Sequence, residues 1–135
     1  MPFIEWSEKL SVNVSKIDEH HKVLIKYIND LFDAMSTGKG KDVLDPILTG
    51  LVDYTKFHFS TEEKFMDQFG YHLSISHKNA HKELTAQVVE LLDKFKSEKT
   101  NLSIPVMHFL KDWLNNHILN VDKKLAEFLN QKGMK

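Results

Sequence analysis

The chain has 135 residues, a formal net charge of −1 and no cysteine. This length suits one ordinary domain with a real core, and the interspersed charges give no sign of a nucleic-acid or anionic-membrane partner. The lack of cysteine excludes disulfides, thiolate catalysis and iron–sulfur ligation. No apolar run approaches the ~20 residues of a membrane span, and the N-terminal MPFIEWSEKL carries acids where a signal peptide needs an apolar stretch. We therefore expect a soluble, cytoplasmic protein with no membrane insertion.

The N-terminal half predicts an arm and two helices. Residues 1–17 show no helical period, so we expect an extended arm whose Phe3, Trp6 and Leu10 pack on the rest of the chain. Apolar residues at i, i+3 and i+4 predict a first helix from about 18 to 35, which the glycines of STGKGK end. A second begins between 42 and 46, where Pro46 suits a first helical turn, and DQFGYHLS ends it.

The C-terminal half predicts two more helices. The third spans roughly 75–95, KSEKTNLS forms a loop, and the fourth covers about 104–129. Four helices of ~20 residues with short connections predict an all-α protein, an antiparallel up-down-up-down four-helix bundle with an extended N-terminal arm. We assign the whole chain, 1–135, to one domain, with the bundle over 18–131.

Four of the eight histidines lie between positions 58 and 81, and their spacing is helical. His58 stands four residues before Glu62, and His77 stands four before His81. Residues four apart share one helix face, so each pair can reach inward together. Both pairs fall among apolar positions rather than on a charged face. This pattern indicates buried polar side chains on two helices.

The other two helices add a histidine each. His21 lies one turn before Ile25, and His117 lies just under one turn after Leu114. Burying so many imidazoles and a carboxylate without partners would cost on the order of 1–3 kcal/mol each, which rivals a typical net stability of ~5–15 kcal/mol. A metal centre removes that conflict. A metal-free bundle is the alternative reading.

Asp122 does not fit this argument from spacing. It follows His117 by five residues, about 140° away on an ideal α-helix, and Val121 holds the better i+4 position. Helical spacing alone places Asp122 on the surface.

The strings IDEHHKVL, HFSTEE, HKNAH and HILNVD resemble the hemerythrin family, particularly its single-domain bacterial members, and the likeness covers essentially the whole chain. The resemblance implies seven metal ligands: His21, His58, Glu62, His77, His81, His117 and Asp122. One departure is His20, where glutamine is commoner in the family. Helical phase assigns the ligand role to His21, and the sequence gives His20, His72 and His108 no role.

The resemblance also implies a cofactor of two iron ions. Glu62, Asp122 and an oxo or hydroxo group would bridge them, and His21 and His58 would hold the iron that keeps an open coordination position. Three histidines would complete the six ligands of the other iron: His77, His81 and His117. Dioxygen would bind end-on at the open position, as a hydroperoxide. The implied function is reversible dioxygen binding, for carriage or storage, rather than catalysis.

By the same resemblance, five apolar residues line the dioxygen pocket: Leu24, Phe59, Trp113, Leu114 and Ile118. Spacing agrees for Leu24, about one turn after His21, and for Leu114, just under one turn before His117. The ligand chemistry fits as well, because five imidazoles and two carboxylates carry less anionic charge than the glutamate-rich sites of ferritin-like oxidases. Less anionic charge stabilises high-valent iron less, which favours reversible binding.

Three other functions were weighed. A zinc protease helix needs Glu directly after the first histidine of HKNAH, and this chain has Lys78, so that class is excluded. A di-iron enzyme or scavenger, peroxidase-like or handling nitric oxide, stays open and would reveal itself by turnover. Sensing of dioxygen, redox state or iron is a third class, for which 135 residues leave no output module. A dioxygen-consuming protein partner cannot be identified from the sequence.

Overall fold

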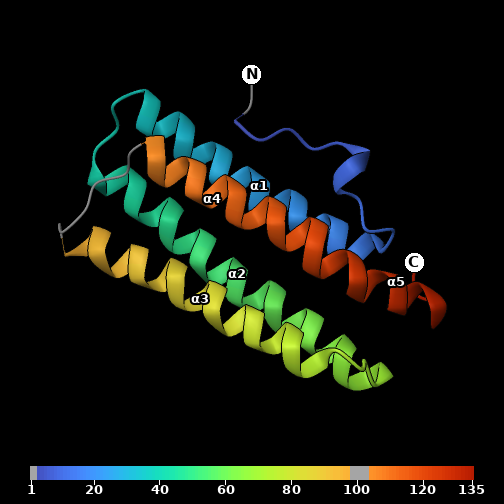
Figure 1. Ribbon diagram of the computed structural model, residues 1–135. Coiled ribbons are helices and arrows are strands. Elements are labelled where there is room, and N and C mark those ends of the chain that lie inside the picture. The colour runs from blue at the N-terminus through green and yellow to red at the C-terminus, as the bar shows by residue number, and fades with distance from the viewer. Residues whose placement is uncertain (1–2, 98–103) are drawn as a thin grey trace.

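The structure is a computed structural model that describes residues 3–97 and 104–135. Four long helical rods lie side by side and alternate in direction, and the described residues contain no strand (Figure 1). The helices are α1 (Ser15–Ser36), α2 (Lys41–Phe69), α3 (Ser74–Lys96), α4 (Ile104–Asn116) and α5 (Lys123–Gln131). The predicted all-α, four-helix bundle is thus confirmed. The predicted loop between the third and fourth helices falls almost entirely outside the described residues.

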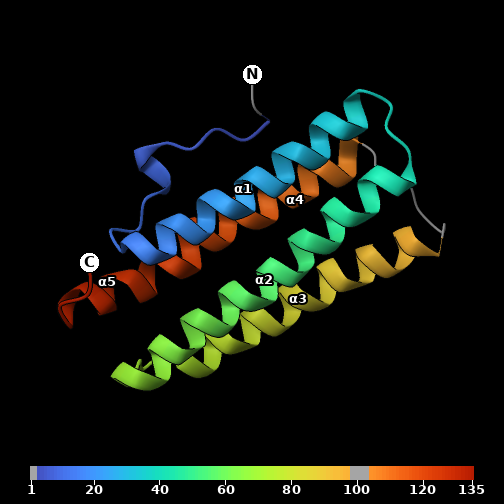
Figure 2. The same cartoon turned by 180° about the vertical axis from the view of Figure 1, so that it is seen from behind.

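The rods pack side by side in two pairs. Viewed from either side, α1 lies against α4 and α2 lies against α3 (Figures 1 and 2). The α1–α2 approach is close at Gly50, because a Cβ there would lie 2.7 Å from the Tyr27 ring. At the end of α2, Gly70 adopts a left-handed φ of 68° and its N–H donates to the Met66 carbonyl, so the chain can turn into α3.

The fourth rod differs from a plain α-helix. The sequence predicts one helix over about 104–129, but α4 passes into a π-helical turn, η2 (His117–Asp122), before α5 begins. The three segments still form one continuous rod (Figure 1). A π-turn takes in one more residue than an α-turn, so it changes which side chains face inward beyond it.

The N-terminal arm packs along α1, as predicted for Phe3, Trp6 and Leu10. It contains a short 3₁₀ turn, η1 (Glu8–Leu10). The Asn29 side chain holds the arm, because its Oδ1 accepts from the Ile4 N–H at 2.7 Å and its Nδ2 donates to the Ile4 carbonyl at 2.8 Å. These two hydrogen bonds hold in place a segment that has few helical hydrogen bonds of its own.

The first helix begins at Ser15, three residues before the predicted start at Asp18. Asp18 instead lies in the first turn and binds the arm: it accepts a hydrogen bond from Ser11 Oγ at 2.6 Å and another from the Val12 N–H at 2.8 Å. In α2, Pro46 lies one turn further in than predicted, because the helix starts at Lys41.

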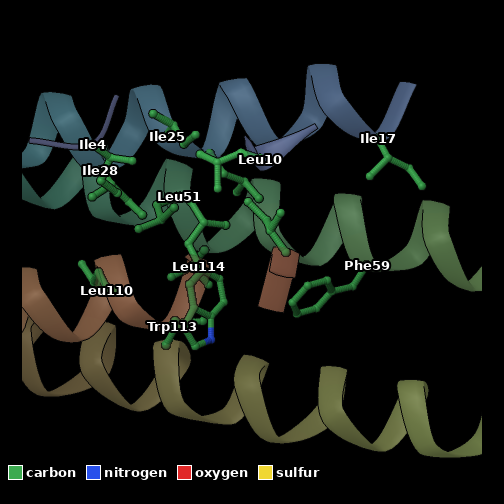
Figure 3. Packing of buried hydrophobic residues seen from close by; sticks show 14 of the residues in the cluster. Ile4, Leu10, Ile17, Ile25, Ile28, Leu51, Phe59, Leu110, Trp113 and Leu114 are labelled. Atoms are coloured by element: carbon green, nitrogen blue, oxygen red, sulfur yellow. The ribbon is translucent and has the colours of Figure 1, made fainter. Parts of the chain in front are cut away.

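Buried aliphatic side chains fill the bundle interior, and Figure 3 shows Ile28, Leu51 and Leu110 meeting between the helices. A cluster of buried polar residues lies towards the end of the bundle where α1 begins and α5 lies, and buried apolar residues such as Ile17 and Leu125 continue the core beyond it. The buried polar cluster is therefore enclosed by apolar core on both sides along the bundle. In the part of the chain that the structure describes, no helix combines the length and apolar character needed to cross a membrane.

Candidate metal centre

The seven side chains named as ligands from the sequence lie together in the interior. Each is at most 3% exposed. Their donor atoms form two overlapping groups, and within each group all atoms lie within 4.8 Å of one another. The first group contains Glu62, His77, His81, His117 and Asp122; the second contains His21, His58, Glu62 and Asp122.

In α1, α2 and α3, the ordinary α-helical period places the ligand side chains on the inward face. The pairs His58–Glu62 on α2 and His77–His81 on α3 each share one helix face, as the spacing predicted. His21 comes from the second turn of α1 and is fully buried. The α-helical period is sufficient to place these five side chains inward.

The fourth rod needs its π-turn. His117 and Asp122 are the first and last residues of η2, and His117 Nε2 lies 2.9 Å from Asp122 Oδ1. A π-turn brings residues i and i+5 onto one face, where an α-helix would separate them. The prediction from α-helical spacing that Asp122 lies on the surface is therefore wrong, and its side chain is fully buried.

Distances between donors match the edges of a metal coordination shell. Asp122 lies 2.7 Å from His21 Nε2 through Oδ2 and 3.3 Å from His77 Nε2 through Oδ1. Glu62 Oε1 lies 3.1 Å from His81 Nε2. Six donors placed ~2.1 Å from one ion are roughly 3 Å from their neighbours, and the donor pairs of this cluster lie between 2.7 and 3.7 Å apart.

Several buried nitrogen and oxygen atoms of the ligand side chains make no hydrogen bond of good geometry within the part of the protein that the structure describes. Among the described residues, five buried ligand-side-chain atoms make no hydrogen bond of good geometry, although His117 Nε2 and Asp122 Oδ1 lie within ion-pair distance of each other: His58 Nε2, His77 Nε2, His117 Nε2, Glu62 Oε2 and Asp122 Oδ1. Each such atom would cost on the order of 1–3 kcal/mol if left bare. Ions bound between them would supply every missing partner, so the residues present fit a metal centre.

Without metal, His77 and His117 bind protons more tightly than an ordinary histidine does. Burial lowers the pKa of His117, but the nearby Asp122 and Glu62 carboxylates outweigh it and raise the pKa to about 10. The pKa of His77 is also raised, because the same carboxylates overcome the effect of burial. Burial alone would raise the pKa of Asp122, yet the surrounding histidines hold it well below its usual value. The metal-free cluster is thus a set of ion pairs, and a metal must displace protons from it.

Two of the five histidines also have a partner on their outer side. His81 Nδ1 lies 2.9 Å from Glu63 Oε2, and His58 Nδ1 lies 2.9 Å from His20 Nδ1. His20 is 6% exposed, and burial lowers its pKa to about 4. Neither His20 nor Glu63 was predicted to have a role, although each directly adjoins a ligand position.

The five residues expected to line a dioxygen pocket are all buried: Leu24, Phe59, Trp113, Leu114 and Ile118. Phe59 projects from α2 towards the region where Trp113 and Leu114 project from α4 (Figure 3). The Phe59 ring stacks on His81 with centroids 3.9 Å apart, so apolar surface directly contacts the ligands. Of the three histidines without a predicted role, His72 and His108 are exposed, whereas His20 is buried.

A surface groove approaches the same region. It lies between α3 and α4, has a volume of about 440 Å³, and includes Leu84, Phe109, Trp113 and His117 in its walls. Trp113 Nε1 is buried and has no hydrogen-bond partner among the described residues. The groove connects one candidate ligand and one candidate pocket residue with the outside of the bundle.

Comparison with known proteins gives consistent matches. The model of the hemerythrin HHE cation binding domain matches residues 12–129. The chain is 32% identical over 124 residues to the bacteriohemerythrin of Methylococcus capsulatus, covering 91% of this chain and 94% of that one. It is 34% identical over 122 residues to a bacteriohemerythrin of Pseudomonas aeruginosa, covering 90% and 78%. A crystal structure of wild-type hemerythrin superposes with a TM-score of 0.87 at 31% identity, covering 93% of this chain and 96% of that one.

Proposed function

The chain belongs to the hemerythrin family, and from that premise we propose that it binds dioxygen reversibly at a centre of two non-haem irons, for carriage or storage. The observation that carries the proposal is the overlap of the two donor groups. Glu62 and Asp122 belong to both groups, while every histidine belongs to one. Two shared carboxylates and separate imidazoles are what a bridged pair of ions requires.

The two groups are unequal, and this inequality supports binding of a small molecule. One group has three histidines and the other has two, His21 and His58. If both ions share the same bridges, the ion with two histidines has one position fewer filled by protein. We propose that dioxygen takes this position end-on and that an oxo or hydroxo group completes the bridge. The ferrous pair would supply two electrons reversibly.

The residues around the ligands fit a carrier. The side chains of Leu24, Phe59 and Ile118 are buried, and we infer that they keep water away from the ligands. Exclusion of water protects a reversibly bound ligand from protonation and displacement. A reducing compartment such as the cytoplasm fits the same proposal, since the chain has no cysteine to suggest disulfides.

One observation favours a second function. The groove between α3 and α4, about 440 Å³ in volume, is larger than dioxygen needs and reaches Trp113 and His117. A di-iron enzyme or scavenger, peroxidase-like or handling nitric oxide, would use such a groove to admit a second substrate. Sensing of dioxygen, redox state or iron would use the same centre without turnover.

Repeated oxygenation separates these functions. The metal-free protein is loaded anaerobically with ferrous iron, its iron content per chain is determined, and its visible spectrum is recorded through cycles of air and deoxygenation. A carrier takes up two irons and shows a visible band that appears and disappears reversibly. Uptake of no iron would contradict the di-iron centre, and irreversible bleaching with consumption of a reductant would favour the enzyme.

A further inference from the structure

Two buried histidines from different helices face each other outside the ligand groups. His20 on α1 and His58 on α2 place their Nδ1 atoms 2.9 Å apart. A hydrogen bond between two imidazole nitrogens needs one ring to donate and the other to accept, so a single proton lies between them. The direction of this bond therefore fixes the tautomer of both rings.

The surroundings of His58 decide the direction. Its Nε2 lies 3.6 Å from Glu62 Oε1 and 3.7 Å from Asp122 Oδ2, within the second donor group. Nε2 has no hydrogen-bond partner among the described residues. An imidazole that ligates through Nε2 needs a free lone pair there, so the proton of the neutral ring is on Nδ1. His58 then donates, and His20 must accept.

We propose that His20 is a positioning residue for His58: its Nδ1 lone pair accepts the His58 Nδ1–H, which fixes the tautomer and the ring orientation that ligation needs. This inference rests on the proposed function, because it takes His58 as a ligand. In most metal sites a carboxylate, a carbonyl or water accepts the outer N–H of a ligating histidine. Here the acceptor is a second imidazole, and its own proton is on Nε2.

Packing holds His20 in the accepting position. Its ring makes an edge contact with Tyr54 at 5.7 Å and a tilted contact with Phe57 at 5.2 Å. An uncharged acceptor also distinguishes His58 from His81, which faces the Glu63 carboxylate. A carboxylate draws the Nδ1 proton more strongly than an imidazole does and makes the ligand more electron-rich. The two donor groups are therefore supported by unlike outer partners.

Three variants test the role of His20. His20→Leu removes the acceptor, His20→Gln keeps one through its amide oxygen, and His72→Leu changes an exposed histidine as a control. Each protein is loaded anaerobically with ferrous iron, and the rate of iron loss to a colorimetric chelator is measured. We expect His20→Leu to lose one of its two irons ~10–100-fold faster, with His20→Gln and His72→Leu within a few-fold of wild type. Far-UV circular dichroism of each metal-free variant controls for folding.

The tautomers give a readout that does not depend on iron release. Long-range ¹H–¹⁵N spectra of the wild-type protein loaded with zinc, a diamagnetic probe, should show His58 protonated at Nδ1 and His20 protonated at Nε2. The reverse assignment would overturn the proposal, as would equal iron retention in wild type and His20→Leu. Equal loss in the Leu and Gln variants would overturn it in favour of packing alone. A wild-type protein that takes up no pair of irons would instead refute the proposed function.

Discussion

His81 lies between two consecutive glutamates: its Nδ1 is 2.9 Å from Glu63 Oε2, and its Nε2 is 3.1 Å from Glu62 Oε1. The ring is thus held on both sides by carboxylates of α2, while its own backbone belongs to α3. Phe59, one turn before Glu63, stacks on the same ring with an interplanar angle of 5°. These contacts fix the position and the tilt of His81 before any metal binds.

The outer glutamate should matter for metal retention. We expect Glu63→Leu to weaken iron binding ~10–100-fold, because the Nδ1–H of His81 loses the acceptor that orients the ring. Glu63→Gln keeps an acceptor oxygen and should fall between the Leu variant and wild type. Iron retention against a chelator measures this. Glu90→Leu is the control, since Glu90 is an exposed carboxylate paired with Lys94 on the surface of α3. Equal retention in Glu63→Leu and Glu90→Leu would contradict a role for Glu63.

The positions that could be predicted from the sequence follow the α-helical period. His58 with Glu62, and His77 with His81, lie at i and i+4, so periodicity alone placed them inward. The burial of Asp122 could not be predicted in this way, because a π-turn has no signature in apolar spacing. Only the resemblance to a family placed Asp122 with the ligands.

The outer contacts were missed for a different reason. His20 and Glu63 act across helices, and a single sequence does not reveal which side chains meet between α1 and α2 or between α2 and α3. Similarly, the apolar period predicted the start of α1 near Asp18, whereas the helix begins at Ser15. The Asp18 carboxylate instead binds the arm at Ser11 and Val12, a tertiary contact that local patterns do not encode.

Substitution of a carboxylate that both donor groups share should lower the iron content per chain more than substitution of a histidine that belongs to one group. Asp122 belongs to both donor groups, so Asp122→Ala should reduce iron content from two per chain to nearly none. His77 belongs to one group, so His77→Ala should leave an iron held by the other group. Iron per chain after gel filtration measures both, with circular dichroism to verify the helices. Equal losses in the two variants would contradict the bridging role of Asp122.

The metal-free protein should lose stability at alkaline pH. His117 has a folded-state pKa of about 10, against ~6.5 when unfolded. Between these values the folded state binds more protons, so the free energy of unfolding falls as pH rises. We expect a loss on the order of 1–3 kcal/mol between pH 7 and pH 9. Urea denaturation of the metal-free protein at the two pH values measures this.

Metal loading provides the control for that prediction. A bound iron takes the place of the proton on His117, so the iron-loaded protein should show a much smaller alkaline decline over the same range. The metal-free His117→Phe variant should also show a smaller decline, with the remainder attributable to His77, whose pKa is raised for the same reason. An equal decline in metal-free, loaded and variant proteins would show that the histidine–carboxylate cluster does not cause it.

The apolar wall beside the ligands should control the lifetime of the oxygenated form. Leu114 is 1% exposed and lies just under one turn before His117. We expect Leu114→Asn to keep both irons but to hasten decay of the oxygenated form to the ferric state, because a polar side chain admits water to a site that needs to stay dry.

Leu110→Asn is the matched control: it buries the same amide one turn further from the ligands, at a fully buried position. Both variants should lose stability, since each buries an amide without a designed partner. The visible band in air then distinguishes them, with fast decay expected only for Leu114→Asn. Equal decay rates in both variants would show that Leu114 contributes to the core alone.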